Sequence, residues 1–406
     1  MDSLSDRLKK LGIQVGAEDI IPPPKSFPVE SIVPGDVIRT PLGESYLVTS
    51  RYRVGAFHGN HMLRGPEGLG GVSQWGGYDD LSSLPHEAFA FLDTETTGLS
   101  GGAGTLVFLV GIARFEGEEL VVAQFFLRSP SEEPAMLEAL EGFLNGVECL
   151  VTFNGKAFDL PLLQNRFITN GWEETWSPNA HLDLLHLARK LWKDRLPSRA
   201  LGDLESQILG VERSEEEVPG WLVPLIYTDY LRQRDARPLR GVFYHNLIDI
   251  LSMVVLLDIC SSLLEHGDAA VDVEPVDLIS MARLWQDSGE LDKAIQLYES
   301  GMERALPGDI FLKAVRQLSF IRKREGDYSS ALKLWRIAAE EGQVYACVEI
   351  AKYQEHSLKD LAEALVWTQT ALELLEKKDY PDEKKEQLKA ELTWREKRVV
   401  RKIGGS

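Results

Sequence analysis

The sequence predicts a mixed α/β domain followed by an all-helical domain, with a small β-rich extension in front. Between residues 85 and 265, apolar segments of strand length alternate with helical segments. From about residue 275 the pattern is helical throughout and repeats itself. Before residue 84, apolar and polar residues alternate around a turn at 41–43, which indicates a β-hairpin. We therefore expect an N-terminal extension (1–84), an α/β domain (85–265) and helical repeats (275–406).

Composition limits the class of protein. The chain has 406 residues, of which 44% are hydrophobic and 26% charged, as in ordinary soluble proteins. Its formal net charge of −19 argues against non-specific wrapping of nucleic acid, but a nuclease that uses metal ions and a local basic patch is not excluded. Three scattered cysteines predict buried free thiols in a reducing compartment. No signal peptide and no run of about 20 apolar residues is apparent, so we expect a cytoplasmic protein that spans no membrane.

The α/β domain begins with a short apolar run at residues 89–92, which predicts a buried strand that ends at Asp93. Side chains alternate along a strand, so Asp93 and Glu95 point the same way. Two adjacent carboxylates repel each other unless a cation lies between them, and oxygen ligands suit Mg²⁺ or Mn²⁺. Taken alone, the pattern is also compatible with an acidic strand end that faces water.

The next segments complete a sheet. Residues 106–115 and 120–128 predict two strands joined by a turn, which form a meander beside the first strand. A capping serine, acidic residues and an early proline at 131–134 predict the start of a helix. That helix reaches about residue 145, and residues 148–153 predict another strand. Three antiparallel strands, a helix and a further strand follow the order of an RNase H-like sheet.

A third carboxylate follows that strand. Asn154 and Gly155 end the strand, and Asp159 lies at the head of a helix that we expect to reach about residue 169. Ligands gather at the edge where strands leave an open α/β sheet, although a helix-capping role explains Asp159 equally well. Lys156 can contact a substrate phosphate or be a solvated loop lysine. Thr96 and Asn154 are the other candidate substrate contacts.

Two further segments have more than one interpretation. Residues 181–199 predict a helical stretch that is the densest basic segment of the chain. With Trp192 among its cations it would suit a nucleic-acid backbone, and a solvated helix face explains it as well. His58 and His61 lie in a glycine-rich loop with no third ligand in view, so we expect them to be exposed rather than to bind a metal.

The last helix of the α/β domain carries His245 and Asp249. They are four residues apart and therefore stack on one helix face. A plain surface pair is the alternative, but three other acids are predicted at one sheet edge, which favours a water-activating base beside a metal ligand. An imidazole titrates near neutral pH, whereas the phenol of Tyr244 does not.

Together these acids resemble a known family. Their order, Asp93, Glu95, Asp159 and Asp249, resembles that of the DEDD 3′–5′ exonucleases, which share an RNase H-like fold. The segments 91–98, 152–163 and 245–249 are similar to the YprB-like branch, some members of which carry helical repeats. The resemblance implies that the four acids bind two divalent ions, Mg²⁺ or Mn²⁺, which cleave a terminal phosphodiester. It also implies that a histidine or tyrosine near the fourth acid handles the proton of the attacking water.

The sequence departs from the family pattern at that proton-handling residue. The family has its histidine five residues before the last acid, or its tyrosine four residues before it. Here Tyr244 is five residues and His245 four residues before Asp249. Helix geometry places the residue four positions back on the face of Asp249, so we expect His245 to be the base.

The helical C-terminal segment contains a repeat. Residues 282–298 are echoed at 324–335 and 360–367, and the alanines Ala294, Ala331 and Ala364 are spaced close to the tetratricopeptide period of about 34 residues. The segment resembles a short tetratricopeptide array, which implies a concave surface for a protein partner. An ordinary helical bundle is the alternative. Residues 382–402 predict a charged capping helix.

The sequence therefore predicts a metal-dependent nuclease, most specifically a 3′–5′ exonuclease that acts on single-stranded ends of DNA or RNA. The predicted catalytic residues are Asp93, Glu95, Asp159, His245 and Asp249. Two alternatives stay open: a catalytically idle nuclease fold that acts as a scaffold through its repeats, and a structure-selective endonuclease on the same fold.

Overall fold

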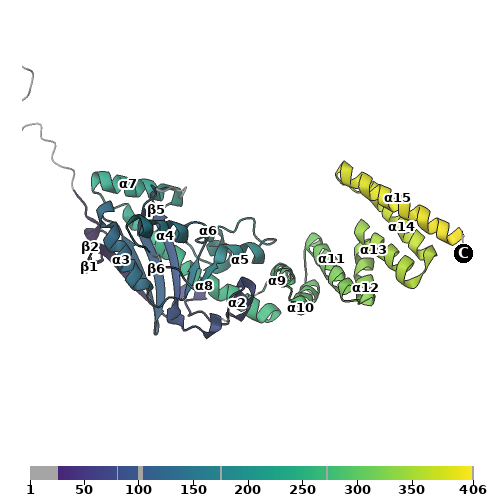
Figure 1. Ribbon diagram of the computed structural model, residues 1–406, viewed down its shortest axis with the longest axis horizontal. Helices are drawn as coiled ribbons and strands as arrows, with labels where there is room; N and C mark the ends of the chain where they lie inside the picture. The colour runs from purple at the N-terminus through teal and green to yellow at the C-terminus, as the bar shows by residue number, and fades with distance from the viewer. Residues whose placement is uncertain (1–25, 80, 99–103, 174–175, 271–272, 405–406) are drawn as a thin grey trace, which may run out of the picture. The chain divides into compact units, whose positions relative to one another are not determined.

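The computed structural model describes residues 26–79, 81–98, 104–173, 176–270 and 273–404 (Figure 1). The chain forms two compact units. The first comprises the residues up to 65 together with 84–183 and 205–255, and contains a mixed β-sheet with helices. The second comprises 66–83, 184–204 and the residues from 256 onward, and is helical. The predicted fold class is confirmed; the first 25 residues of the predicted extension lie outside the described residues.

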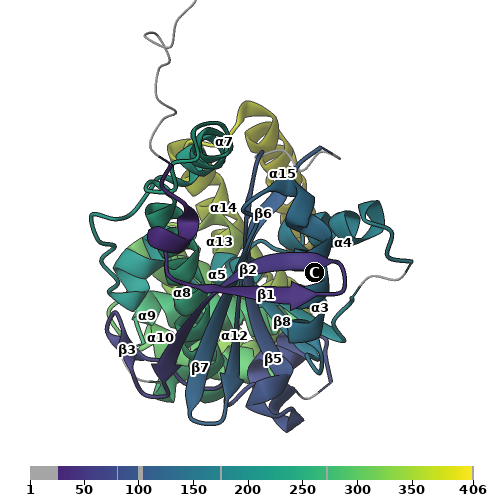
Figure 2. The ribbon, with the colours of Figure 1, turned by 90° about the vertical axis from the view of Figure 1, so that its left-hand side faces the viewer.

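The main sheet has seven strands in the order β1-β2-β7-β6-β5-β8-β9 (Figure 2). From β1 to β5 every neighbouring pair is antiparallel, whereas β5, β8 and β9 are parallel. Strand β5, which carries the first two predicted acids, is therefore the point at which the sheet changes from antiparallel to parallel. The strands are β1 Asp36–Thr40, β2 Gly43–Arg53, β5 Phe89–Thr96, β6 Val107–Glu116, β7 Glu119–Phe126, β8 Cys149–Thr152 and β9 Ala180–Asp183, beside a small hairpin of β3 Phe57–His58 and β4 His61–Met62.

The predicted N-terminal hairpin is present as β1 and β2. It does not stand apart, because β2 pairs with β7 along eight residues, from Tyr46 opposite Phe126 to Arg53 opposite Glu119. The Tyr46 ring is fully buried, and its hydroxyl donates a hydrogen bond to the carbonyl of Val33 at 2.6 Å. The extension therefore lengthens the main sheet by two strands.

Helices cover both faces of this sheet. Gln124 and Phe125 are neighbours on β7 and point to opposite faces. The Gln124 amide donates to the carbonyl of Phe243 on α8 at 2.9 Å, whereas the Phe125 ring packs edge-on against Phe143 of α3. The sheet thus lies between α8 and α3, as both ribbon views show (Figures 1 and 2).

The second unit is built mainly from consecutive helices. Each of α9 to α14 contacts the next helix along the chain. The landmark alanines Ala294, Ala331 and Ala364 are fully buried, which is compatible with the predicted repeats. The helices of the whole chain are α2 Gly70–Gly76, α3 Glu133–Leu144, α4 Asp159–Thr169, α5 Leu184–Leu191, α6 Leu201–Leu204, α7 Val223–Gln233, α8 Leu239–His266, α9 Pro275–Asp287, α10 Leu291–Met302, α11 Gly308–Arg324, α12 Tyr328–Glu340, α13 Val344–Tyr353, α14 Leu361–Lys377 and α15 Asp382–Gly404.

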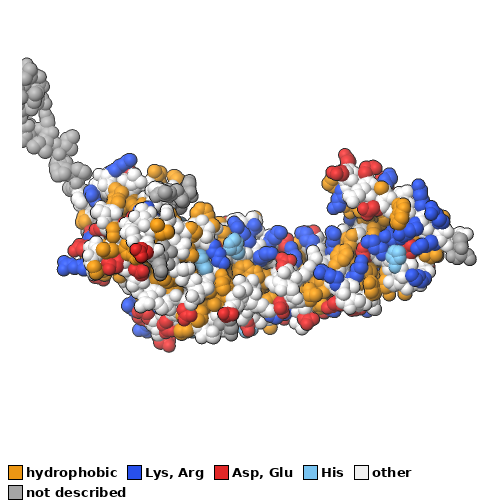
Figure 3. All heavy atoms as spheres, viewed as in Figure 1, with side chains coloured by type: hydrophobic (Ala, Val, Ile, Leu, Met, Phe, Trp, Pro, Cys, Tyr) orange, Lys and Arg blue, Asp and Glu red, His pale blue; other side chains and the backbone are white. Residues whose placement is uncertain are grey.

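The last helix, α15, is attached through one buried carboxylate. The side chain of Glu355 is inaccessible to solvent and accepts hydrogen bonds from Arg395 at 3.0 Å, Lys402 at 2.8 Å and Arg398. Basic side chains accordingly gather over α14 and α15 in Figure 3. A buried carboxylate without such partners would be strongly unfavourable, so these pairs fix the register of α15.

Two predicted elements differ from the structure. Strand β5 continues through Thr96, because its last residues pair with β6 from Asp93 opposite Gly111 to Thr96 opposite Val107. Strand β9 lies beside β8 and takes up residues 181–183, the start of the predicted helical stretch. All four residues of β9 are buried, and a strand of only four residues is too short for periodicity to distinguish it from the helix that follows.

Part of the predicted basic segment is used for contacts within the protein. Trp192 is only 1% exposed. Lys190 pairs with Asp287 at 2.9 Å and Arg195 with the buried Asp277 at 2.7 Å, and both acids lie on α9. These cations are therefore used to join α5 and the residues after it to α9.

The prediction of buried free thiols is confirmed. All three cysteines are free and buried, and burial raises the pKa of the Cys149 thiol to about 12.

Among the described residues, one helix, Leu239–Ala269, is long and apolar enough to cross a membrane. However, 67% of its most apolar window is buried inside the protein, which favours a core helix.

Gly111 permits the approach of α8 to the sheet. A Cβ atom at this position would lie 2.0 Å from Asn246 Oδ1 and 2.4 Å from Ile250 Cδ1. We expect Gly111→Ala to lower the free energy of unfolding by about 1–3 kcal/mol, because the core would be overpacked. Thermal denaturation measures this. The control is Gly142→Ala on α3, where the added methyl meets nothing within 4 Å. Equal stability of the two variants would contradict the close-approach argument.

Candidate active site

The first two acids face helix α8. Asp93 and Glu95 are two residues apart on β5 and therefore share a face of the sheet. Asp93 Oδ2 accepts a hydrogen bond of 2.8 Å from the side-chain amide of Asn246 on α8. That amide is itself fixed, because its oxygen accepts from Gln124 of β7 at 2.8 Å. The Asp93 carboxylate is thus held by a buried amide pair that bridges the sheet and the helix.

Helix α8 supplies the histidine and the fourth acid. His245 Nε2 lies 3.7 Å from Asp249 Oδ2 and 3.9 Å from Glu95 Oε1, so the structure brings these three predicted residues together. Tyr244 points elsewhere, and its hydroxyl accepts a hydrogen bond from the Ser214 N–H at 2.8 Å. Of the two candidate proton-handling residues, only His245 therefore lies among the acids.

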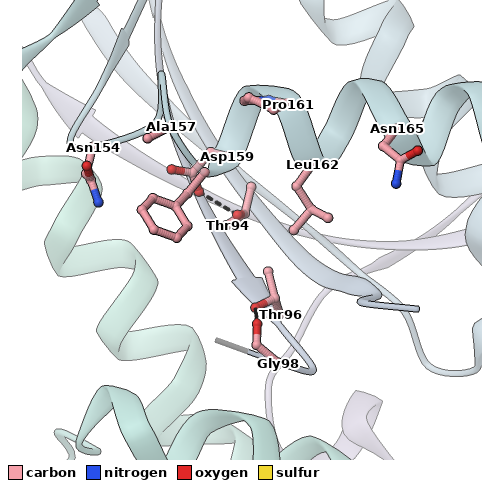
Figure 4. A pocket seen from close by; sticks show the side chains of 10 residues that line it. Thr94, Thr96, Gly98, Asn154, Ala157, Asp159, Pro161, Leu162 and Asn165 are labelled. Atoms are coloured by element: carbon pink, nitrogen blue, oxygen red, sulfur yellow. Dashed lines mark hydrogen bonds between the residues drawn. The ribbon is translucent and has the colours of Figure 1, made fainter. Parts of the chain in front are cut away.

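Asp159 approaches from the other side of β5. It is the first residue of α4, and its Oδ1 accepts a hydrogen bond of 2.5 Å from the Thr94 hydroxyl. Thr94 lies between Asp93 and Glu95 in sequence and so points to the opposite face of the sheet. Figure 4 shows this pair at the foot of α4. Asp159 still interacts electrostatically with Asp93 and Glu95.

A pocket of about 560 Å³ opens beside Asp159 (Figure 4). Two of the three predicted substrate contacts, Thr96 and Asn154, line it. The third, Lys156, is exposed and is not among the lining residues; its backbone N–H donates to Asp183 at 3.1 Å. The lining consists of Thr94, Thr96, Gly98, Asn154, Ala157, Phe158, Asp159, Pro161, Leu162 and Asn165.

The acids are electrostatically frustrated. Burial and then repulsion by Asp249, Glu95 and Asp159 raise the pKa of Asp93 well above its usual range. Burial and the neighbouring carboxylates raise the pKa of Glu95 in the same way. Burial raises the pKa of Asp159 to about 6, although the hydrogen bond from Thr94 opposes the shift. Such a group of hard oxygen donors with excess negative charge is the kind of site that a divalent cation stabilises.

The donor atoms do not yet converge on one point. In the part of the chain that the structure describes, no three Asp, Glu, His or Cys side chains are arranged to hold a metal ion as they stand. Three of the acids have other partners: Asp93 is hydrogen-bonded to Asn246, Asp159 to Thr94, and Asp249 to Arg213. The residue types and their charge fit divalent ions, provided that side chains rotate away from these partners.

Sequence reasoning missed the partners of the fourth acid. Arg213 forms ion pairs with Asp249, with Glu205 at 2.6 Å and with Glu217 at 2.8 Å. Glu217 Oε1 also lies 2.5 Å from His245 Nδ1. No motif marks these residues, because their association depends on tertiary structure. A lone arginine among the acids of residues 212–217 was the only signal available.

The prediction that both loop histidines are exposed is wrong. His58 is only 7% exposed, and its Nε2 lies 2.9 Å from Ser252 Oγ. Burial lowers the pKa of His58 to about 4, so the imidazole is neutral at physiological pH. His61 Nε2 lies 3.2 Å from the carbonyl oxygen of Ile208. Both rings serve as structural hydrogen-bonding groups.

Comparisons with known proteins agree with the fold. Residues 90–261 match the model of the RNase H superfamily. The chain is 35% identical over 283 residues to the protein described as uncharacterized protein YprB of Bacillus subtilis (strain 168), and the match covers 68% of this chain and 67% of that one.

Two polymerases also show similarity, over smaller parts of their length. The chain is 31% identical over 109 residues to DNA polymerase III PolC-type of Mycoplasma pneumoniae, a match that covers 22% of this chain and 8% of the polymerase. The family B DNA polymerase from the archaeon Pyrobaculum calidifontis is similar in structure, with a TM-score of 0.34 and 14% identity over 60% of this chain and 34% of the polymerase.

The raised pKa of Asp159 predicts how stability depends on pH in protein freed of metal with a chelator. Because the folded pKa of about 6 exceeds the ordinary value of 3.8, ionisation of Asp159 destabilises the folded state as the pH rises through this range. We expect Asp159→Asn to stabilise the protein by about 3 kcal/mol at most at pH 7, and to lose this gain below about pH 4.

Denaturant unfolding at pH 7 and pH 4 measures the effect. The matched control is Asp235→Asn, since the hydrogen bonds of Asp235 with Arg237 lower its pKa, so no gain is expected. If Asp159→Asn were no more stable than the parent protein at pH 7, the electrostatic description of the site would be wrong.

Proposed function

Because the chain belongs to the RNase H superfamily as a homologue of YprB, we propose that it is a metal-dependent nuclease, specifically a 3′–5′ exonuclease. The observation that carries the proposal is the group of largely buried carboxylates that β5, α4 and α8 bring together. Burying several carboxylates side by side costs stability, and a catalytic role explains why the fold tolerates that cost.

Each acid has a defined place in the proposed site. Asp93 and Glu95 lie on β5, Asp249 faces them from α8, and Asp159 would join them from α4 after its side chain leaves Thr94. Two divalent ions, Mg²⁺ or Mn²⁺, held by these carboxylates would supply an activated water and neutralise charge on the phosphate.

His245 is the proposed general base. Its Nε2 is the ring nitrogen that faces Glu95 and Asp249, so it is placed to take a proton from a water beside the acids. Its Nδ1 lies beside Glu217 Oε1, and this carboxylate would stabilise the imidazolium that forms. This arrangement accounts for the order of Tyr244 and His245 in the sequence, because the tyrosine hydroxyl instead accepts a hydrogen bond from the backbone N–H of Ser214.

The pocket beside Asp159 supports cleavage at a chain end. Its volume lies in the range of pockets that enclose small ligands, so it would take a terminal nucleotide rather than a continuous duplex. Thr96 and Asn154 would contact that nucleotide, and the ring of Phe158, which is 51% exposed, offers a face for base stacking. Lys156 is outside the pocket lining and would contact a phosphate further along the strand.

The helical repeats provide a second part of the proposal. We propose that helices α9 to α14 form a tetratricopeptide-like array that binds a protein partner. The full burial of the landmark alanines, where successive helices contact each other, supports the repeat interpretation. If the nuclease site were idle, this surface would be the functional part of the protein, and a cleavage assay distinguishes the two cases.

The first test is cleavage of end-labelled single-stranded DNA and RNA with Mg²⁺ or Mn²⁺. We expect progressive shortening from the 3′ end, and Asp93→Asn should reduce the rate about a thousandfold or more, because metal neutralisation of charge is worth several kcal/mol. Asp229→Asn, an exposed acid on α7, is the control and should cleave normally. A circular single strand should resist cleavage; its cleavage would indicate an endonuclease. Absence of cleavage on every substrate would favour the scaffold function.

The base assignment has its own test. We expect His245→Gln to lower kcat by about 10²–10⁴-fold, as for the loss of a general base, whereas Tyr244→Phe should retain nearly full activity. Single-turnover cleavage rates would show the slower chemical step only in the first variant. The reverse result, with Tyr244 essential and His245 dispensable, would overturn the assignment.

A further inference from the structure

The guanidinium of Arg213 is a positive charge that lies among the acids of the site. Its guanidinium forms a two-point pair with Glu205, with Nε to Oε2 at 2.6 Å and Nη2 to Oε1 at 2.8 Å. Nη2 also donates to Asp249 Oδ1, and Nη1 donates to Glu217 Oε1 at 2.8 Å and lies 3.0 Å from His245 Nδ1. The arginine therefore contacts both residues that α8 contributes to the proposed chemistry.

The arginine is anchored independently of Asp249. Glu205 is 1% exposed and lies in the π-helical turn Glu205–Leu209. Its Oε1 accepts a hydrogen bond of 2.7 Å from Ser252 Oγ, and that hydroxyl lies 2.9 Å from His58 Nε2. Since Ser252 donates to Glu205, the neutral imidazole of His58 donates to Ser252. This buried chain fixes Glu205, and Glu205 holds Arg213 in place even when Asp249 takes another partner.

Both its position and its charge make Arg213 oppose the binding of a metal ion at Asp249. The Asp249 oxygen that binds the guanidinium cannot at the same time be a free metal ligand, and a nearby positive charge opposes the entry of a second cation. Asp93 and Asp159 are instead bonded to a neutral amide and a neutral hydroxyl, which carry no such charge. Asp249 is thus the carboxylate for which a metal ion would have to compete directly with a positive charge.

We propose that Arg213 is a positioning residue that occupies Asp249 as a built-in counter-ion and competes with divalent metal for this carboxylate. The proposal rests on the proposed function, since it concerns the same four acids. It assigns to Arg213 a specific consequence: the ion that needs Asp249 binds more weakly than the carboxylates alone would allow. The anchor at Glu205 then keeps the guanidinium beside His245 and Glu217 after Asp249 has turned to the metal.

The test is Mn²⁺ binding to the full chain without substrate, measured by isothermal titration and by the electron paramagnetic resonance signal of free Mn²⁺. Arg213→Gln should bind the ion that needs Asp249 roughly tenfold more tightly or better than the parent protein, because a charge within about 4–6 Å shifts such equilibria by one or more powers of ten. Arg213→Lys, which keeps the cation, should remain near the parent value.

Two further variants make the result interpretable. Arg213→Gln leaves Glu205 buried without its partner, so the double variant Arg213→Gln with Glu205→Gln removes both charges and should show the same gain in a folded protein. Adding Asp249→Asn to Arg213→Gln should abolish the gain. Circular dichroism confirms folding in each case.

The outcomes separate this inference from the proposed function. Tighter Mn²⁺ binding in both arginine-free variants supports the competition. Unchanged or weaker binding in the folded double variant, with a parent protein that binds Mn²⁺ and cleaves, would overturn the role of Arg213 and leave the nuclease function intact. If neither the parent protein nor any variant bound Mn²⁺, the proposed function itself would fail, and the inference with it.

Discussion

The repulsion between buried carboxylates is the constraint on which the rest of the structure depends. Burial and mutual repulsion raise the pKa values of Asp93 and Glu95, and Asp249 adds to the repulsion from α8. A fold would normally avoid such a group, because each unpaired buried charge costs several kcal/mol. The surrounding polar contacts reduce this cost only in part, which leaves a site that a divalent cation would stabilise.

The fold supports this group with rigid elements rather than loops. Asp93 and Glu95 lie inside the hydrogen-bonded part of β5, an interior strand of the sheet, where the ladder to β6 fixes their direction. His245, Asn246 and Asp249 come from successive turns of one long helix. Because β5 and α8 are joined through Asn246 and Gln124, the two halves of the site cannot drift apart without breaking buried hydrogen bonds.

Much of the fold and part of the site could be predicted from the sequence. Strand alternation correctly placed Asp93 and Glu95 on one face, and the head of α4 was correctly located at Asp159. Both are local properties of the chain. Strand β9 was missed because its four residues directly precede a helix and carry too little periodicity to separate strand from helix.

The contacts that the sequence could not reveal are those between distant segments. Arg213 meets Glu205 and Asp249 only after the chain has folded, and nothing in the spacing of these residues announces it. The same applies to Lys190 and Arg195, whose clustering suggested a nucleic-acid surface although each pairs with an acid of α9. Clustered charge in a sequence does not distinguish an exposed patch from a set of ion pairs. The metal ligands and catalytic roles stay predictions.

The absence of a side chain at Gly111 affects how mutational data on this protein should be interpreted. Gly111 lies opposite Asp93 on the neighbouring strand, and the space that a side chain would fill is taken by Asn246. A saturation screen scored on activity would therefore show position 111 to be as intolerant as the acids, although glycine brings no functional group to the reaction. In such a screen, positions around β5 could be intolerant because α8 packs closely against them or because they take part in catalysis. Only activity measurements on variants shown to be folded would separate the two causes.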